Sequence, residues 1–553
     1  MSQIATYKNA ATRRATGAAG EWEAMACKKR VLLSLLLIVL VVAAVRLPLL
    51  NLPFERDEGE YAYIAWRLGH HELPYRDWVD QKPPAIFWTY QLALKLPLDP
   101  VCAVHLMGLL WSAATAGALF LLAVRFLKPF WALTAAILFG LLSADPSLEG
   151  TAANTELFML LPLTLSLLAF FPAVTDRPRG LHFMILAGVL TGVAVAFKQV
   201  AAVNWLLLVA LCPVFGAREQ RLRRTGQFAI WSAAGAALVW GLITAGFFLR
   251  HALADFLYNV WFHNLDYIQA VPWAVRLALC RETLASLAPS QALVWIFAAG
   301  GLAALFITRR RKGLLFLVGW MAASLAGVSA SGYFFPHYFQ QWLPALAVAA
   351  AVGAEALDDD RWWKHVSARS RRILLVGLLV LLPIRVSLPF LVSYSPAEAV
   401  RKIYPGNQFA EMREVGRRMA QITRPDDRVF IFGSEPEVLF YAQRVSATRY
   451  IILFPLYGPY RDALDQQKAA AQEITDHRPA AGFYLPNQLF FVPGAEQYFT
   501  RWSQSYFRDH FQADTFLTLD ATGQARLVYG AGNQAPAVPA GQRIAGILWR
   551  QNP

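Results

Sequence analysis

The chain has 553 residues, of which 56% are hydrophobic and only 16% are charged, and its formal net charge is +14. Such an apolar composition excludes a soluble protein of this length and is typical of a polytopic membrane protein. The basic residues stand in short clusters between apolar runs, so they indicate cytoplasmic loops, and no nucleic-acid partner is expected. The four cysteines have no metal-ligand spacing, so neither a disulfide framework nor a zinc site is predicted.

Residues 1–30 are predicted to form a cytoplasmic tail, because they end in a Lys-Lys-Arg cluster ahead of an apolar run. We interpret that run, residues 31–50, as a retained signal anchor. Further apolar runs follow at residues 101–127, 131–144, 157–172, 181–215, 228–249, 287–307, 314–330, 338–356 and 373–391.

Basic clusters separate these runs, at residues 125–128, 177–179, 218–224, 309–312 and 364–372. If all the clusters are cytoplasmic, the number of crossings between any two of them is even. This rule divides the long run 181–215 into two short spans that turn outside near Lys198 and Gln199. It predicts about 11 crossings, with the N-terminus inside and the C-terminal region outside.

Residues 396–553 have the composition of a soluble domain, which we expect on the outer face. Its pattern predicts an α/β fold, because short apolar runs typical of buried strands alternate with a helical segment at 462–476. Strands are expected at 428–433, 449–454, 481–485 and 543–549, with a hairpin at 516–528. No glycine-rich phosphate loop follows a strand, so the sequence predicts no chemistry for this domain.

The first outer loop, residues 51–100, gathers acids, a lysine and aromatic residues between two apolar runs. Apolar residues at helical spacing over 61–68 predict a helix in the membrane interface with one face in water. Asp57 stands at its start, either as an N-cap that forms a capping box with Glu60 or as a catalytic carboxylate, and the two roles are compatible. Glu58 is a second acid beside it, catalytic or metal-binding.

Lys82 precedes two prolines, which fix the backbone where the next apolar segment begins. It is either a lysine that snorkels to the membrane surface or an anchor for a lipid phosphate. A base near a cation is what sugar transfer from a phosphate leaving group requires.

Other candidates for substrate binding stand at the outer ends of the predicted spans. Glu156 begins one span and is either a cavity residue or an acid favoured by the helix dipole. Lys198, beside Gln199, should have a phosphate or carboxylate neighbour, since an unpaired buried lysine is costly. His337 and Tyr338 begin another span. They either bind substrate or serve only as a helix-capping histidine and an aromatic residue at the membrane interface.

Residues 55–88, which contain ERDEGEYAYIAWRL and LPYRDWVDQKPPAIFW, resemble the first outer loop of a known enzyme family. The family is that of the bacterial dolichyl-phosphate-mannose-protein mannosyltransferase-like glycosyltransferases, family 39, which are related to the aminoarabinose transferases that modify lipid A. Residues 153–162, 197–200 and 336–346 are also similar to it. The resemblance spans roughly residues 30–395.

The resemblance implies a GT-C fold for residues 31–395 and a polyprenyl-phosphate sugar as the donor. It implies that Asp57 is the catalytic aspartate, Glu58 its acidic partner and Lys82 the lysine that contacts phosphate. We therefore expect an inverting membrane glycosyltransferase at the outer face of the bacterial plasma membrane, with a lipid, glycan or protein as the acceptor.

In this hypothesis Asp57 removes the acceptor's proton and Lys82 stabilises the leaving phosphate, with Arg56 or Lys198 assisting. Tyr61 is a further substrate-binding candidate. A divalent metal at Asp57 and Glu58 stays open, since two acids supply only part of a hard-cation site. The rival classes are a transporter or lipid flippase with an outer sensory domain, and an inactive scaffold. Acids gathered at span ends on one side favour the transferase.

Overall fold

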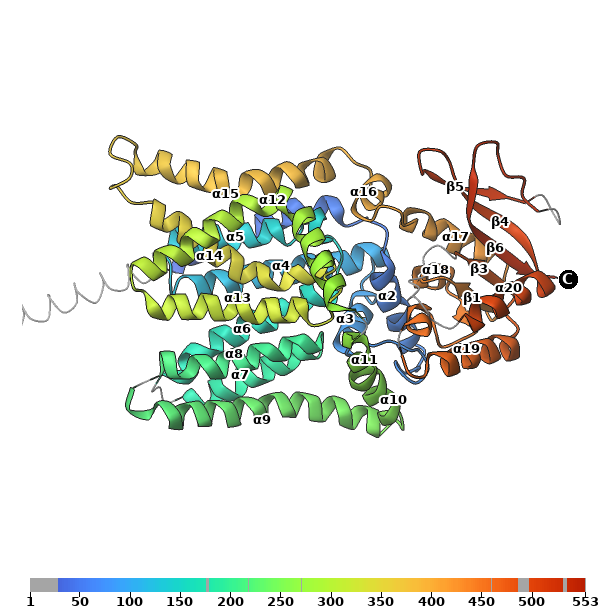
Figure 1. Cartoon of the computed structure of the whole chain (residues 1–553), viewed down its shortest axis with the longest axis horizontal. Helices are drawn as coiled ribbons and strands as arrows, with labels where there is room; N and C mark the ends of the chain where they lie inside the picture. The colour runs from blue at the N-terminus through green and yellow to red at the C-terminus, as the bar shows by residue number, and fades with distance from the viewer. Residues whose placement is uncertain are drawn as a thin grey trace, which may run out of the picture.

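The computed structural model describes residues 28–175, 179–216, 218–269, 271–458, 460–485, 497–530 and 535–552. A bundle of long helices forms one part of the molecule and a sheet with its helices forms the other (Figure 1). The predicted cytoplasmic tail lies almost entirely outside the described residues, as does the basic cluster around residue 177.

Helices occupy every predicted apolar run within the described ranges. They are Lys28–Leu49, α4 (Pro100–Ala123), α5 (Pro129–Leu142), α6 (Thr155–Val174), α7 (Gly180–Val195), α8 (Val203–Phe215), α9 (Arg221–Phe248), α12 (Trp273–Ile307), α13 (Arg311–Ser329), α14 (Leu343–Leu357) and α15 (Ala368–Val392).

Seven of these helices are long and apolar enough to cross a membrane, counted within the described part of the chain. The chain is therefore a multi-pass membrane protein. Helices α5, α7 and α8 are apolar but shorter, so the predicted count of about 11 crossings stays a prediction. The predicted break in the run 181–215 is confirmed, because α7 ends at Val195 and a 3₁₀ turn, Gln199–Ala202, leads into α8.

Helix α14 lies at the centre of the bundle and is buried along almost its whole length. Its small residues allow α12 to approach closely, and a Cβ added at Gly301 would lie 2.1 Å from the carbonyl oxygen of Ala349. This contact fixes the 3₁₀ segment that leads into α14, Pro336–Trp342, at one end of the bundle.

Two short helices of the first loop, α2 (Arg56–Leu68) and α3 (Ala85–Ala93), lie between the bundle and the C-terminal domain (Figure 1). The predicted helix over 61–68 is present, but the expected wet face is wrong. Gly59 and Tyr63, on the face opposite Tyr61 and Ile64, are also buried. The C-terminal domain covers that face through α18 (Pro436–Ala442) and through the N–H of Ser446, which donates to the Tyr63 hydroxyl at 2.9 Å. The backbones of α2 and α18 meet at Gly59, where an added Cβ would lie 2.4 Å from the Cβ of Glu437.

A segment that the sequence left unassigned connects α9 to α12. It contains α10 (Leu253–Leu257), a π-helical turn (Tyr258–Phe262) and α11 (His263–Gln269), and it also lies between the bundle and the C-terminal domain. Helix α12 begins at Trp273, well before the predicted run 287–307.

The C-terminal region is an α/β domain built on one six-stranded sheet, in the order β2-β1-β3-β6-β4-β5. Strand β1 pairs in parallel with β2 and β3, and the other pairs are antiparallel. Its elements are α16 (Pro396–Ile403), α17 (Phe409–Gln421), β1 (Arg428–Phe432), α18, β2 (Val445–Ser446), α19 (Ala463–His477), β3 (Ala481–Tyr484), α20 (Tyr498–His510), β4 (Phe511–Leu519), β5 (Ala525–Tyr529) and β6 (Arg543–Gln551).

The predicted strands at 428–433, 481–485 and 543–549, the hairpin and the helix at 462–476 are confirmed within a few residues. The strand predicted at 449–454 is wrong, because this segment is irregular and leads into a 3₁₀ turn. Its apolar side chains are buried, and the backbone carbonyl of Arg449 accepts a hydrogen bond from the N–H of Val79 at 3.0 Å. A short apolar run does not distinguish a buried strand from a buried irregular segment.

Candidate active site

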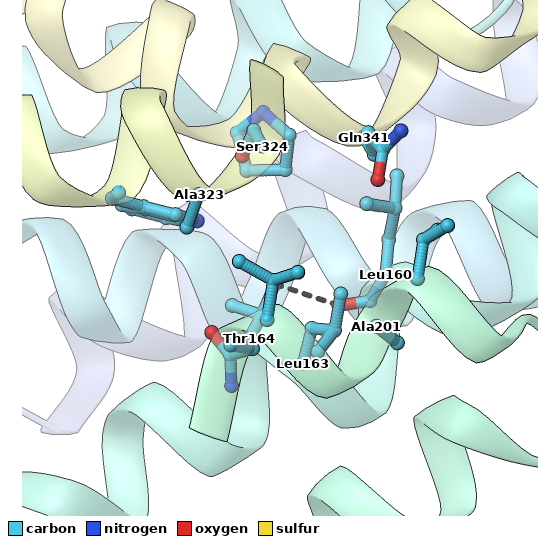
Figure 2. A pocket seen from close by; sticks show the side chains of 12 residues that line it. Leu160, Leu163, Thr164, Ala201, Ala323, Ser324 and Gln341 are labelled. Carbon is cyan, nitrogen blue, oxygen red and sulfur yellow. Dashed lines mark hydrogen bonds between the residues drawn. The ribbon is translucent and has the colours of Figure 1, made fainter. Parts of the chain in front are cut away.

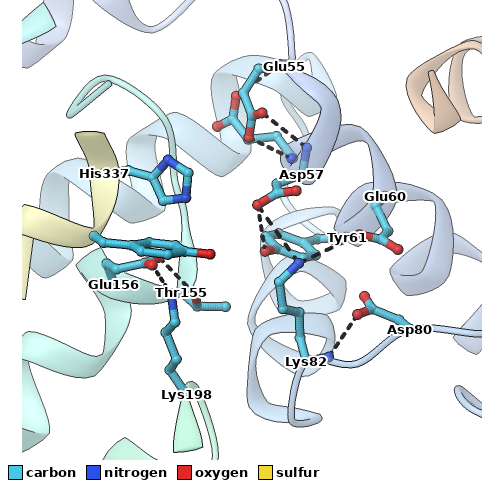
Figure 3. Close-up of polar contacts among 12 residues, drawn as sticks. Glu55, Asp57, Glu60, Tyr61, Asp80, Lys82, Thr155, Glu156, Lys198 and His337 are labelled. Atoms are coloured by element: carbon cyan, nitrogen blue, oxygen red, sulfur yellow. Dashed lines mark hydrogen bonds and ion pairs between the residues drawn. The ribbon is translucent and has the colours of Figure 1, made fainter. Parts of the chain in front are cut away.

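A cavity of about 250 Å³ lies where the first loop, one end of the helix bundle and the C-terminal region meet. Seven of the predicted site residues line it: Arg56, Asp57, Lys82, Glu156, Lys198, His337 and Tyr338. Asp57 and Lys82 come from one wall, and Glu156, Lys198 and His337 from the wall opposite (Figure 3). The fold therefore gathers residues that are far apart in the sequence.

Asp57 lies in the first turn of α2 but is not its N-cap, so the predicted capping box with Glu60 is wrong. Glu55 is the N-cap, and its carboxylate accepts hydrogen bonds from the backbone N–H groups of Asp57 and Glu58, each at 3.1 Å. The Glu58 carboxylate completes the capping box. Because Glu55 caps the helix, the Asp57 carboxylate is left to face the cavity.

The Asp57 carboxylate meets two groups of its own wall. Its Oδ2 lies 3.8 Å from Nζ of Lys82 and accepts a 3.4 Å hydrogen bond from the hydroxyl of Tyr61. The Lys82 ammonium also lies 3.8 Å from Oε2 of Glu60. Asp80 fixes the Lys82 backbone by accepting its N–H at 2.7 Å. The first loop thus holds one amine among several carboxyl groups.

The charges of this wall determine its protonation. Burial raises the pKa of the Asp57 carboxyl, but the positive charges of Lys82, His337 and Arg56 outweigh burial and hold that pKa below its ordinary value. Burial lowers the pKa of Lys82, but the charge of Asp57 and its neighbours raises it well above the usual value. At neutral pH Asp57 is therefore a carboxylate that can take up a proton, and Lys82 is a cation.

The opposite wall holds a second lysine and carboxylate, in closer contact. Glu156 forms an ion pair with Lys198 and accepts a 2.9 Å hydrogen bond from the Thr155 hydroxyl. The Lys198 ammonium lies 3.7 Å from the ring centroid of Tyr338, a cation–π contact. The expected carboxylate neighbour of Lys198 is thus present. Burial lowers the pKa of Lys198, and the charge of Glu156 offsets this only in part.

His337 faces the cavity beside this pair. Its Nδ1 lies 2.6 Å from Oε2 of Glu149, a residue of the α5–α6 connection, so the histidine contacts a distant loop. Burial lowers the pKa of His337, but Glu156 and the hydrogen bond to Glu149 outweigh it and raise the pKa to about 9. The imidazole is consequently a further cation of the cavity at neutral pH, besides Lys82, Lys198 and Arg56.

Three predicted site residues do not line the cavity. Tyr61 packs beneath Lys82, with its ring centroid 5.3 Å from Nζ, and bonds Asp57. Glu58 points into the protein, where its Oε1 contacts Nε2 of His105 at 2.9 Å and accepts the N–H of Ala153 at 2.7 Å. Gln199 donates to the backbone carbonyl of Gln81 at 3.2 Å, and so it supports the loop from behind.

The pair predicted as a possible metal site does not fit a shared ion. Asp57 faces the cavity, whereas Glu58 is 2% exposed and already bonded to His105 and Ala153. Within the described residues, no group of three or more His, Cys, Asp or Glu side chains is arranged to hold a metal ion.

Arg56 links the first loop to the C-terminal domain. Its Nε donates to the backbone carbonyl of Ser434 at 2.5 Å, and its Nη2 lies 3.4 Å from both Glu435 and the side-chain oxygen of Asn407. Sequence reasoning missed the residues that the C-terminal region adds to the cavity, among them Tyr404, Asn407, Phe409 and Ser434. No motif marks them, because only domain docking brings them to Asp57.

A second, smaller hollow lies deep in the bundle, between α6, α8 and α13 (Figure 2). Its volume of about 20 Å³ is near that needed for one water molecule. Thr164, Asn204, Ser324 and Gln341 are its polar lining residues, and none of them titrates. The acid–base groups are gathered instead in the larger cavity.

The fold is that of the GT-C glycosyltransferases. ArnT from Cupriavidus metallidurans, in a crystal structure with undecaprenyl phosphate, matches with a TM-score of 0.59 and 15% identity over 94% of this chain and 97% of that chain. The archaeal oligosaccharyltransferase AglB from Archaeoglobus fulgidus, in complex with an inhibitory peptide and a dolichol-phosphate, matches with a TM-score of 0.50 and 12% identity over 93% and 75% of the two chains.

Residues 81–243 match the sequence model of the dolichyl-phosphate-mannose-protein mannosyltransferase family. This range begins beside Lys82 and includes both Glu156 and Lys198. No curated protein sequence matches the chain significantly. The family match and the fold together support a membrane glycosyltransferase of the GT-C type, as the resemblance implied, and the transporter alternative is not favoured.

Proposed function

We propose that the chain transfers a sugar from a polyprenyl phosphate to an acceptor hydroxyl or phosphate at the outer face of the bacterial plasma membrane. The observation that carries the proposal is the placement of Asp57 and Lys82, a carboxylate and an ammonium 3.8 Å apart that face one cavity. The likeness to a structure with bound undecaprenyl phosphate supports this class of donor.

In the proposed step the acceptor oxygen attacks the anomeric carbon, and Asp57 takes the acceptor's proton. The bond from the anomeric carbon to the phosphate oxygen breaks, and its electron pair leaves with the polyprenyl phosphate. Lys82 stabilises that phosphate, and Lys198 and His337 add positive charge from the facing wall. A single displacement inverts the anomeric configuration.

Glu58 has a positioning role in this proposal. Its contacts with His105 and with the backbone of Ala153 tie the start of α2 to α4 and α6, and it closes the capping box of α2. Because the cap fixes the first turn, it also fixes the direction of the Asp57 side chain.

The proposal is tested with purified protein and a labelled polyprenyl-phosphate sugar, by measuring release of the sugar-free lipid phosphate. Asp57→Asn should remove activity, because an amide cannot accept the proton. Asp77→Asn, in the same loop but outside the cavity lining, is the matched control and should retain activity. Near-normal release by Asp57→Asn would rule out Asp57 as the base.

The proposed orientation places the cavity and the C-terminal domain outside and the N-terminus in the cytoplasm. His70 is exposed and belongs to the first loop. With the four native cysteines replaced by serine, His70→Cys should react with an impermeant thiol reagent in intact cells. Reaction only after lysis would reverse the topology.

A further inference from the structure

Four residues that line the cavity each carry a buried polar atom that has no hydrogen-bond partner among the described residues. The atoms are Oδ2 of Asp80, whose carboxyl group also interacts with that of Glu60, Oε1 of Gln81, the hydroxyl of Tyr404 and Oγ of Ser434. Buried polar atoms are almost always bonded in folded proteins, so four such atoms around one cavity point to a ligand. About 250 Å³ is also many times the roughly 10–15 Å³ that one water molecule needs on the same measure.

The four atoms belong to two different parts of the cavity lining. Asp80 and Gln81 come from the first loop, next to Lys82. Tyr404 and Ser434 come from the C-terminal region, where Phe409 adds an aromatic face with the Arg56 guanidinium 5.7 Å from its ring centroid. A ligand held between the two parts would lie beside Asp57.

The chemistry of these groups differs from that of the phosphate-binding candidates. Lys82, Lys198 and His337 supply positive charge, as an anion requires. The unpartnered atoms are two hydroxyls, an amide oxygen and a carboxyl oxygen, which suit ligand hydroxyls that both donate and accept. Hydroxyls around a ring with an apolar face are the chemistry of a carbohydrate.

We propose that Tyr404 and Ser434, together with Asp80 and Gln81, bind the hydroxyls of the sugar while it is still attached to the polyprenyl phosphate. The inference rests on the proposed function, because a phosphate at Lys82 would place the attached sugar against these residues. It makes the C-terminal domain a determinant of sugar specificity. The sugar gains hydrogen bonds that the sugar-free lipid phosphate does not make.

The test compares binding of decaprenyl phosphate with binding of decaprenyl phosphates that carry mannose, glucose or arabinose, to the full chain in nanodiscs. The unaltered protein should bind at least one sugar-bearing lipid more tightly than decaprenyl phosphate. Tyr404→Phe and Ser434→Ala should each reduce this preference by about 3- to 10-fold, the effect of one lost hydrogen bond. The affinity for decaprenyl phosphate itself should change by less than about 2-fold.

Tyr441→Phe and Ser446→Ala are matched controls, since both residues lie in the C-terminal domain outside the cavity lining and their oxygens accept hydrogen bonds. Neither should alter the preference. The inference is wrong if no sugar-bearing lipid is preferred, or if Tyr404→Phe and Ser434→Ala leave the preference intact, as they would if this wall bound only the acceptor. Lys82→Ala tests the proposed function separately, because it should weaken binding of the sugar-free lipid.

Discussion

Two lysine–carboxylate pairs face each other across the cavity, and they differ in how closely each lysine is held. Lys82 lies 3.8 Å from Asp57, whereas Lys198 is in direct contact with Glu156. The pKa of Lys82 is raised well above its ordinary value, and that of Lys198 is lowered, because burial prevails there. A loosely held pair leaves both groups available to substrate. We therefore expect the first pair to act on the donor and the second to shape the facing wall.

The comparison is tested most strongly by removing each carboxylate. Asp57→Asn should lower the transfer rate by about 10²- to 10⁴-fold, the usual contribution of a general base. Glu156→Gln should cost much less, because the amide oxygen can still accept from Thr155 and Lys198. Initial rates of sugar transfer at saturating donor measure both. A greater loss in Glu156→Gln would reverse the assignment of the two pairs.

Replacing the two lysines should affect different quantities: the donor KM for Lys82 and the Tm for Lys198. Lys82→Met should raise the donor KM by about 10- to 100-fold, because a charge-assisted contact to phosphate is lost. Lys198→Met should chiefly lower the Tm, since it leaves the 1% exposed Glu156 carboxylate without its cation, which costs about 3–5 kcal/mol. Adding Glu156→Gln to Lys198→Met should recover much of the lost Tm. No recovery would mean that the second pair is not a stability element.

The position of the first pair also depends on how α2 docks. Gly59→Ala would place a Cβ 2.4 Å from that of Glu437, so α2 and α18 must separate, at about 1–3 kcal/mol of stability. We expect roughly tenfold slower transfer, because a small displacement of Asp57 impairs catalysis. The control is Gly226→Ala in α9, where an added Cβ meets nothing within 4 Å. Normal transfer by Gly59→Ala would show that the docking does not position Asp57.

The helical part of this fold could be predicted because two signals agree. Apolar runs mark the helices, and the charge rule divides 181–215 at Lys198, where run length alone suggests one long helix. The interfacial position of α2 and the strand at 449–454 were predicted wrongly for related reasons. The C-terminal domain buries α2, and Tyr450 and Leu453 are buried in the core of that domain without strand pairing. Sequence periodicity shows neither which partner buries a face nor whether a buried run is a strand.

The site was predictable where a motif holds its residues close together. Asp57 and Lys82 are an example, although adjacency misled for Glu58, whose side chain points about 100° away from that of Asp57 on the helix and bonds His105 and Ala153. Glu149 and Tyr404 carried no signal, and the segment GSEPE around Ser434 carried only a weak one. They reach the cavity through a loop contact and through domain docking, which no local pattern encodes.

The smallest expected effect concerns charge on the facing wall. The pKa of His337 is raised from 6.5 to about 9, so its positive charge and its bond to Glu149 are fully present below about pH 6.5 and are lost as the pH rises through about 9. The donor KM should therefore rise several-fold between pH 8 and 10, whereas Asp57, with its lowered pKa, stays ionised throughout. KM measured against pH in the unaltered protein and in His337→Gln checks this. A flat profile in the variant assigns the effect to the histidine, and an unchanged rise would assign it to Lys198, whose lowered pKa brings its titration toward the same range.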